Sequence, residues 1–463
     1  MKLTILGGGG FRVPLVYRAL LADASDRRVT QVRLFDADPA RAQAIANVLR
    51  AQAAAATTDT APQVQICRTL DEALEEADFV FSAIRVGGIH GRAQDERIAL
   101  RHGLIGQETT GFGGISYALR GIPVVVDLAQ RIAALCPQAW VINFTNPAGL
   151  ITELMSRTLG ERVIGICDSP VGLARRVLTT LERAGLVPAG SAAGVGLGDG
   201  RVHVDYVGLN HLGWLRGLQV EGTDVLPRLL ERADLIESFE EGRLFKADWI
   251  RTLGAVPNEY LHYYYYQREA YEADAAAEAT RGVYLLSQQS DFYARAADLP
   301  PEEAWHLWEH TRMDREQTYM ATNRQAAGNF ERDAEDLTSG GYDRVALAIM
   351  HAIAHDEPAE LILNVPNRGL LADLDSGAVV EVPCRVDSGG VHPLPAAPLP
   401  DYARSPVIGA KYAERCTIQA GLTGDRAAAL RALVAHPLVD SVNVAQDILA
   451  ESIDTFPELA YLR

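Results

Sequence analysis

A thiol and a carboxylate stand side by side in the segment "GICDSP" at 165–170, as Cys167 and Asp168. The segment continues a short apolar run and is closed by a proline, a pattern that predicts a buried strand ending in a turn. In a second segment, "GLNHLGW" at 208–214, His211 lies among apolar residues, next to an amide and two glycines. A thiolate and an imidazole suit a borderline divalent metal. The spacing by itself favours packing roles for both, because only the fold could bring two such distant residues together.

The four glycines that follow the first apolar segment are typical of a dinucleotide-binding turn. Glycines let the backbone approach a pyrophosphate, and the next helix supplies N–H donors and the positive end of its dipole. The match to G-x-G-x-x-G is incomplete, since Arg12 takes the position of the third glycine. Asp36 strengthens the prediction, because a carboxylate at the end of the second strand, "VRLFD", binds the ribose hydroxyls of NAD.

The alternative to this NAD site is a tight strand–helix turn that binds no nucleotide. Asp36 implies a cofactor with an unphosphorylated ribose, although Arg33 or Arg41 lies near enough in the sequence to complicate that prediction. The residues predicted to bind the cofactor are Gly7, Gly8, Gly9, Gly10, Phe11, Arg12, Asp36 and Arg41.

Composition excludes several classes of protein. The chain has 463 residues, of which 48% are hydrophobic and 22% charged, and its formal net charge is −17. The charge argues against a nucleic-acid partner, and the lack of a run of about 18 apolar residues argues against a membrane span. The start "MKLTILGGGG" is not typical of a signal peptide. Five cysteines without a C-x-x-C pair favour free thiols, so we expect a cytoplasmic protein.

The order of predicted elements indicates an α/β protein of two closely packed parts. Up to residue 168, apolar strands such as Val163–Cys167 alternate with helical segments such as Phe11–Ala22, which favours a parallel, doubly wound, Rossmann-like sheet. From about residue 196 the segment "GRVHVDYVGLNHLGWLRGLQVEG" alternates like antiparallel strands. A helical region at about 226–355 and a second one at 406–450 follow. We therefore predict a nucleotide-binding domain at 1–168 and an α+β domain at 169–463 that carries metal, substrate and oligomer contacts.

Several long motifs resemble those of glycoside hydrolase family 4, the NAD- and metal-dependent glycosidases related to lactate and malate dehydrogenases. The similarity runs nearly end to end. It covers "GGGG" with Pro14, "FDAD" at 35–38, "IRVGG" at 84–88, "DERIALRHGLIGQETTGFGG" at 95–114, "ALRGIP" at 118–123, "NFTNPAG" at 143–149, "GICDSP", "GLNHLGW", "PNEYLHYYY" at 257–265, "NVPNRG" at 364–369 and "HPLV" at 436–439.

The resemblance implies a set of site residues. A divalent metal, usually Mn²⁺, would be held by Cys167 and His211, and Tyr260 would be the catalytic base. Asp168 would protonate the departing oxygen or accept from a metal-bound water. Substrate contacts are implied for Asn146 and, at the phosphate, for Arg281, with further residues of the site motifs at Arg85, Glu108 and Asn210.

The reaction that the resemblance implies is a hydrolysis through oxidation and elimination. NAD⁺ takes a hydride from sugar C3, a base removes the C2 proton, the aglycone leaves from C1, water adds and the hydride returns. The motifs "IRVGG" and "GQETTG" are similar to the 6-phospho-β-glucosidase branch, whereas Asp168 is similar to the 6-phospho-α-glucosidase branch. We expect a 6-phospho-β-glucosidase of phosphorylated disaccharides, with the α-specific enzyme or an α-galactosidase or galacturonidase as alternatives.

Two alternatives from other classes stay open. A dehydrogenase of the lactate or malate type would share the first domain and release NADH, and a non-catalytic NAD-binding protein would need no metal. The family resemblance further suggests a homodimer or homotetramer.

Overall fold

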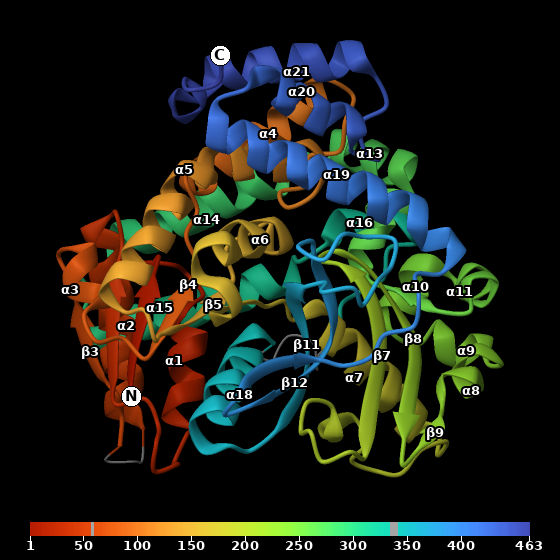
Figure 1. The fold of residues 1–463 in the computed structure, drawn as a ribbon, viewed down its shortest axis with the longest axis horizontal. Coiled ribbons are helices and arrows are strands. Elements are labelled where there is room, and N and C mark those ends of the chain that lie inside the picture. The colour runs from red at the N-terminus through yellow and green to blue at the C-terminus, as the bar shows by residue number, and fades with distance from the viewer. Residues whose placement is uncertain (57–59, 334–340) are drawn as a thin grey trace.

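The computed structural model describes residues 1–56, 60–333 and 341–463. Its first half alternates strands with helices (Figure 1), as the sequence predicts. The elements are β1 (Lys2–Leu6), α1 (Val13–Leu21), β2 (Gln31–Phe35), α2 (Pro39–Ala55), β3 (Gln63–Ile66), α3 (Leu70–Leu74), β4 (Phe79–Ser82), α4 (Gly88–Arg101), α5 (Gly111–Leu135), β5 (Trp140–Asn143), α6 (Ala148–Leu159), β6 (Val163–Gly165) and α7 (Ser169–Arg183).

Six parallel strands form the doubly wound part of the sheet, in the order β3-β2-β1-β4-β5-β6. This is the strand order of a dinucleotide-binding fold, and the predicted fold class is confirmed. One face of the sheet carries a hydrophobic core shared with α1, α2 and α7. The opposite face packs against α3, α5 and α6. Ligands of such sheets bind at the carboxyl ends of the strands, where the strand order reverses between β1 and β4.

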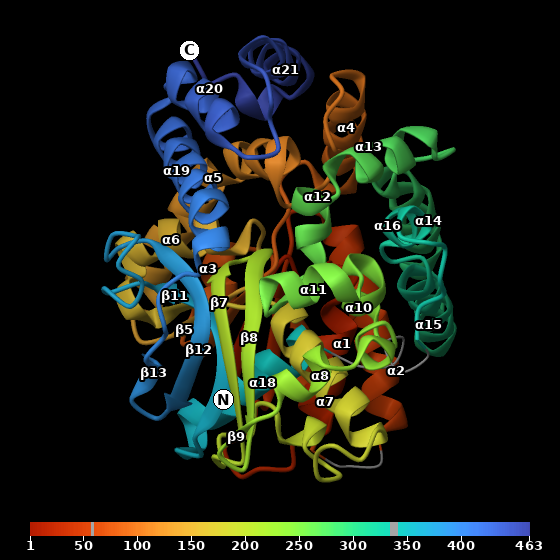
Figure 2. The same ribbon diagram turned by 90° about the vertical axis from the view of Figure 1, so that its right-hand side faces the viewer.

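The second half adds antiparallel strands to the same sheet. Its strands are β7 (Val202–Leu209), β8 (Leu212–Val220), β9 (Thr223–Asp224), β10 (Val256–Pro257), β11 (Ala359–Pro366), β12 (Val379–Asp387) and β13 (Gly390–Pro393). β11 pairs with β6, β12 with β11, and β7 with β12, so one sheet runs from β3 to β10 across the whole described chain. Figure 2 shows β7, β8 and β12 side by side. The division at residue 168 stays a prediction.

Helices fill most of the remainder. They are α8 (Leu226–Leu230), α9 (Ala233–Ile236), α10 (Glu240–Phe245), α11 (Ala247–Leu253), α12 (His262–Tyr265), α13 (Gln267–Ala276), α14 (Arg281–Ala296), α15 (Pro301–Gln317), α16 (Ala321–Ala326), α18 (Tyr342–His355), α19 (Asp401–Thr423), α20 (Arg426–Ala435) and α21 (Val442–Thr455). The helical region predicted at 226–355 is confirmed outside 334–340, which are not among the described residues.

The C-terminal helices α19, α20 and α21 cross the top of the molecule in Figure 1 and pack on α4 and α5 through a third hydrophobic core. α5 is the described helix that is long and apolar enough to span a membrane, yet 78% of its most apolar window is buried inside the protein. Its apolar surface is therefore used for packing within the fold.

Two element boundaries differ from those the sequence predicts. The helix expected from Phe11 begins at Val13, because Phe11 and Arg12 belong to the turn and Pro14, which has no N–H to donate, occupies the first helical turn. The strand expected to end at Cys167 ends at Gly165. Cys167 thus lies in the connection to α7, free of strand pairing and able to turn toward the carboxyl edge of the sheet.

Gly165 lies where the parallel and antiparallel halves meet, opposite Asn364 of β11. A Cβ at this position would lie 2.3 Å from Thr152 Oγ1 and 2.7 Å from Asn364 Cβ. We expect Gly165→Ala to destabilise the protein by about 1–3 kcal/mol through overpacking, lowering the midpoint of thermal unfolding. Gly121→Ala in α5 is the control, because its Cβ would meet no atom within 4 Å. If the two variants have the same midpoint of thermal unfolding, the close packing around Gly165 does not contribute to stability.

Candidate active site

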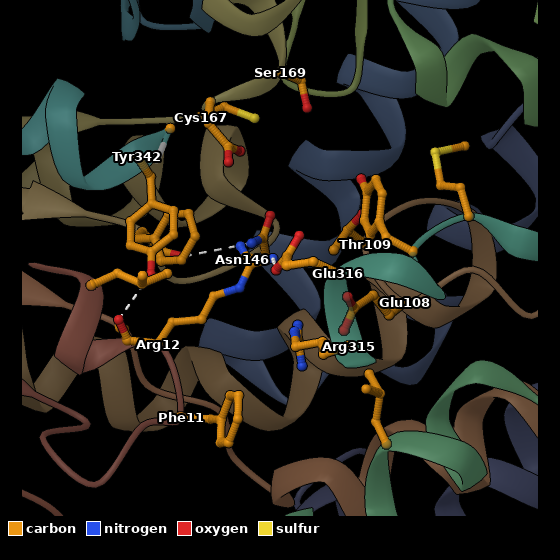
Figure 3. A pocket seen from close by; sticks show the side chains of 18 of the residues that line it. Phe11, Arg12, Glu108, Thr109, Asn146, Cys167, Ser169, Arg315, Glu316 and Tyr342 are labelled. Atoms are coloured by element: carbon orange, nitrogen blue, oxygen red, sulfur yellow. Dashed lines mark hydrogen bonds and ion pairs between the residues drawn. The ribbon is translucent and has the colours of Figure 1, made fainter. Parts of the chain in front are cut away.

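A cleft of about 1860 Å³ opens at the carboxyl edge of the parallel strands. Its wall includes the glycine turn, Asp36 after β2, Asn146 after β5, and Cys167 and Asp168 after β6. Side chains from the second half, His211, Tyr260 and Arg281 among them, close the cleft from the other side. Figure 3 shows part of this wall, with Cys167, Asn146, Arg12 and Arg315 around one space. The cleft therefore joins the predicted nucleotide turn to the predicted metal ligands.

Cys167 and His211 meet although 44 positions separate them: Cys167 Sγ lies 3.6 Å from His211 Nε2. Cys167 comes from the β6–α7 connection, and His211 from the two-residue turn between β7 and β8. His211 has a φ of 62°, a left-handed conformation that residues other than glycine seldom adopt. Such backbone strain persists where the surroundings fix it, often at functional sites. The turn thereby directs the imidazole to the thiol.

Burial sets the protonation of this pair. It raises the pKa of the Cys167 thiol well above its ordinary value, and the negative charges of Glu381 and Asp168 add to the shift. It also lowers the pKa of His211 to about 3, so the imidazole is neutral at physiological pH. Neutral imidazole is the form that binds metals, and a bound cation would favour the thiolate of Cys167.

The donor set fits a divalent metal that also binds substrate. The described residues hold no group of three or more His, Cys, Asp and Glu side chains suited to one ion, so Cys167 and His211 would leave coordination positions open. Asn146 Oδ1 lies on the same cleft, buried, with no hydrogen-bond partner in the described structure. A buried acceptor without a partner costs free energy, which a ligand hydroxyl would recover.

Tyr260 is held against the metal ligands by two contacts. Its ring stacks on the imidazole of His211, with centroids 3.7 Å apart and planes 15° apart. Its hydroxyl lies 3.0 Å from that of Tyr319, which in turn donates to Glu259 Oε1 at 3.1 Å. Burial, followed by the charge of Glu259, raises the pKa of Tyr260 well above its ordinary value. Without a metal ion beside it, the phenol therefore keeps its proton.

Arginines dominate one wall of the cleft, and two of them are neutralised internally. Glu108 bridges Arg85 and Arg92, at 2.5 Å and 2.7 Å. Burial alone would raise the pKa of Glu108, but Arg85 and then Arg92 outweigh it and lower that pKa to about 2. Arg92 also pairs with Glu96. The two carboxylates, Glu108 and Glu96, leave Arg85 and Arg92 with little net positive charge for a ligand.

Arg281 and Arg315 add positive charge to this wall, although Glu316 and Glu108 lie near enough to act on them. Arg281 donates to Thr318 Oγ1 and to the Arg315 carbonyl, at 2.6 and 2.8 Å. Arg315 has no salt bridge to any described residue and lies next to Glu108 in Figure 3. Burial and then Arg92 lower the pKa of Arg281 to about 10, and burial and then Arg12 lower that of Arg315 to about 9. Both remain cationic at neutral pH, so this wall favours an anion.

The glycine turn and Asp36 are arranged for a nucleotide. Gly7 has a φ of 81°, and a Cβ there would lie 2.5 Å from Ala83 O, so only glycine fits. Asp36 Oδ2 accepts from Gly9 N at 2.8 Å, and the guanidinium of Arg41 covers the ring of Tyr293 at 3.9 Å. Of the predicted residues, Gly7, Gly10, Phe11, Arg12, Asp36 and Arg41 line the cleft, whereas Gly8 and Gly9 pack closely on β2 and α2.

Two further predicted residues take distinct positions. Asp168 lies at the N-terminus of α7 on the cleft wall. Burial lowers the pKa of the neighbouring Arg12, but the charge of Glu316 and, more weakly, that of Asp168 contribute to raising it above its ordinary value. Asn210 points elsewhere: its amide donates to Glu381 Oε1 at 3.0 Å, and it lines a small separate cavity. A direct substrate contact by Asn210 thus has no support in this geometry.

Sequence reasoning missed five residues of the site: Arg92, Thr109, Glu259, Arg315 and Tyr319. Arg92 had a signal, since it precedes Glu96 by one helical turn. Thr109 and Glu259 lie inside motifs that the sequence displays, next to residues that were selected. Arg315 and Tyr319 lie at and just after the end of α15 and have no local signature. Only the tertiary fold brings them to the cleft.

Comparison with known proteins agrees with this architecture. Residues 2–183 match the protein family described as "Family 4 glycosyl hydrolase", and residues 206–439 match the "Family 4 glycosyl hydrolase C-terminal domain". The chain belongs to glycosyl hydrolase family 4. It is 29% identical to a probable 6-phospho-β-glucosidase of Bacillus subtilis, over 98% of this chain and 96% of the relative. It is 28% identical to a maltose-6'-phosphate glucosidase of the same organism, over 99% and 97%.

A solved structure is similar over nearly its whole length. The 6-phospho-β-glucosidase of Thermotoga maritima, in a structure with manganese, NAD⁺ and glucose-6-phosphate, superposes with a TM-score of 0.78 at 28% identity and covers 99% of each chain. A 6-phospho-α-glucosidase from gut microorganisms reaches the same TM-score at 22% identity, which indicates a common fold.

Glu108 makes a pH-dependent contribution to stability. Its pKa is lowered from 4.5 to about 2, so that contribution is present above pH 4.5 and is lost as the pH falls toward 2. Glu108→Gln should therefore unfold at a lower temperature than the wild type near neutral pH. Below pH 4.5 the difference in unfolding free energy should shrink by about 1.4 kcal/mol per pH unit.

The control is Glu161→Gln, which removes the exposed pair with Arg368 and should change stability little at any pH. Thermal unfolding from pH 6 to pH 3.5 measures both variants. If the difference in unfolding free energy between the wild type and Glu108→Gln stays constant over this range, Glu108 is not an ionised, paired group.

Proposed function

We propose that this protein is a 6-phospho-β-glucosidase that needs NAD⁺ and Mn²⁺ and hydrolyses phosphorylated disaccharides. The observation that carries the proposal is the meeting of Cys167 with His211, under the stacked ring of Tyr260, in a cleft that continues to the glycine turn. A simple dehydrogenase has no use for this thiol–imidazole pair. The relatives named 6-phospho-β-glucosidase and the structure with manganese, NAD⁺ and glucose-6-phosphate support the same activity.

Each residue near the reacting sugar then has a distinct task. When bound, NAD⁺ would accept the hydride from sugar C3, and the metal would withdraw electron density from the neighbouring hydroxyl oxygens. Cys167 and His211 would hold the metal, and Asn146 would accept from a sugar hydroxyl. Tyr260 removes the proton from C2, oriented by its contacts with His211 and Tyr319. Elimination of the aglycone from C1 follows, and Asp168 supplies its proton.

The arginine wall supports a phosphorylated substrate. Arg315, which has no salt bridge to a described residue, and Arg281 together offer guanidinium donors to a phosphate dianion. The internal pairs of Glu108 with Arg85 and Arg92 keep this wall from accumulating four unpaired charges.

A 6-phospho-α-glucosidase is the second candidate. Asp168 at the start of α7 and the relatives named maltose-6'-phosphate glucosidase favour it. Because proton abstraction at C2 precedes departure of the aglycone, the mechanism constrains the direction of the leaving group only weakly.

Location and assembly belong to the same proposal. Five free cysteines support a reducing, cytoplasmic setting. Exposed apolar side chains on α19, Ile408, Tyr412 and Leu422, support a homodimer or homotetramer. Light scattering of the purified protein measures the assembly.

The direct test is hydrolysis of the nitrophenyl 6-phospho-β- and 6-phospho-α-glucosides, with and without NAD⁺ and Mn²⁺. Hydrolysis should need both, without net formation of NADH. NADH growing in step with substrate loss would instead identify a dehydrogenase, and a preference for the α-anomer would select the second candidate.

Arg315→Gln should raise KM for the phosphorylated glucoside roughly 10- to 100-fold, the effect of one charge-assisted hydrogen bond. If the wild type hydrolyses the free glucoside as fast as the phosphorylated glucoside, the proposed recognition of a substrate phosphate is wrong.

Tyr260→Phe tests the base. The variant keeps the ring that stacks on His211 and removes the hydroxyl, so NAD⁺ binding should survive. Exchange of the C2 hydrogen with solvent deuterium and release of the aglycone should both fall by roughly 10²- to 10⁴-fold, the range of general base catalysis. Tyr264→Phe is the control, because its hydroxyl contacts Thr110 and not the His211 side of the cleft. Undiminished exchange in Tyr260→Phe would remove this residue from the mechanism.

A further inference from the structure

A chain of hydrogen bonds reaches His211 from the side opposite Cys167. Gln107 Oε1 accepts from Thr109 N at 2.5 Å, from Thr110 N at 2.9 Å and from Thr109 Oγ1 at 2.9 Å. Thr109 Oγ1 lies 2.8 Å from His211 Nδ1. Thr109 and His211 are both buried, with 7% and 6% of their surface exposed. Water is therefore kept from competing for these bonds.

The contact between Thr109 Oγ1 and Gln107 Oε1 orders the donors and acceptors of this chain, because an amide oxygen has no hydrogen to give. Two backbone N–H groups point at one atom of the Gln107 amide, so that atom is the oxygen. A threonine hydroxyl has one hydrogen, and Thr109 gives it to Gln107. Toward His211 the hydroxyl can then only accept, so Nδ1 carries the hydrogen of this bond. Nε2 is left as the nitrogen with a free lone pair, and it faces Cys167 Sγ.

The imidazole is thus fixed in two ways. The bond from Nδ1 to Thr109 sets the rotation of the ring within its plane, and the stacked ring of Tyr260 sets the plane itself. The opposite tautomer would place a hydrogen on the atom that must bind the ion and leave Nδ1 facing a hydroxyl that has no hydrogen to give.

We propose that Gln107 and Thr109 are positioning residues that commit His211 to metal binding through Nε2. The inference rests on the proposed function, which puts a divalent metal between Cys167 and His211. Hydrogen-bond partners of metal-binding histidines raise ligand basicity and fix ring orientation, and their loss typically weakens metal affinity 10- to 100-fold.

Thr109→Val is the main test, since valine keeps the shape and loses the hydroxyl. The dissociation constant of Mn²⁺, measured by electron paramagnetic resonance on the full-length protein, should rise roughly 10- to 100-fold. Thr109→Ser should restore the wild-type value. Thr110→Val is the matched control, because this neighbouring hydroxyl contacts Tyr264 and His436 instead of His211. NAD⁺ binding and the thermal midpoint are recorded for every variant.

The outcomes separate this inference from the proposed function. If the wild-type protein binds no Mn²⁺, or if Cys167→Ser leaves Mn²⁺ binding unchanged, the proposed metal site is wrong, and the positioning role is wrong with it. Mn²⁺ binding that depends on Cys167 but is unchanged in Thr109→Val would overturn the positioning role alone. Equal weakening in Thr110→Val would also overturn it, since the effect would then be structural.

A spectroscopic measurement decides the case even if Thr109→Val fails to fold. The ¹⁵N chemical shifts of the His211 ring in metal-free wild-type protein distinguish a protonated from an unprotonated nitrogen. Hydrogen on Nδ1 with a bare Nε2 supports the assignment, and the reverse tautomer overturns it.

Discussion

The pairing of β6 with β11 is the constraint on which the active site depends. It consists of one registered pair, Gly165 with Asn364, yet it joins a parallel sheet to an antiparallel one. On the far side, β12 pairs with β7 through Glu381 and Gly208. The end of β6 and the tip of the β7–β8 hairpin are thereby held at one edge of a continuous sheet. A thiol from one half and an imidazole from the other meet there because the pairing of the strands brings the two connections to the same edge.

Burial keeps the reacting centre of the cleft neutral. Desolvation raises the pKa of Cys167 and Tyr260 and lowers that of His211, so all three groups are neutral near pH 7. Cationic arginines line the same cleft. Neutral groups therefore surround the metal ligands, and the arginines supply positive charge for an anionic part of the ligand.

Much of the fold could be predicted, because its strands are short apolar segments separated by helices of distinct periodicity. The continuity of the sheet could not, since no local pattern marks β11 as the neighbour of β6. Within the site, Cys167, His211 and Tyr260 could be predicted only because their motifs resemble those of the family, since spacing by itself favoured packing roles for Cys167 and His211. Arg315 and Tyr319 are ordinary helical residues by sequence and become part of the site only through the packing of α15 and the segment after it. Asn210 shows the converse, because a motif residue can face Glu381 instead of the cleft.

The arginine wall has a consequence for how a sugar phosphate reaches the protein. The molecule as a whole carries a formal charge of −17, so an anionic ligand is repelled at long range and attracted only after it enters the cleft. Dissolved salt screens charges farther apart than about 10 Å at 0.1 M, while partly buried contacts are screened much less. Moderate ionic strength therefore weakens the outer repulsion more than the inner attraction. Diffusional encounter with a phosphorylated sugar becomes faster as salt rises, the opposite of the behaviour of an enzyme whose whole surface steers its ligand inward.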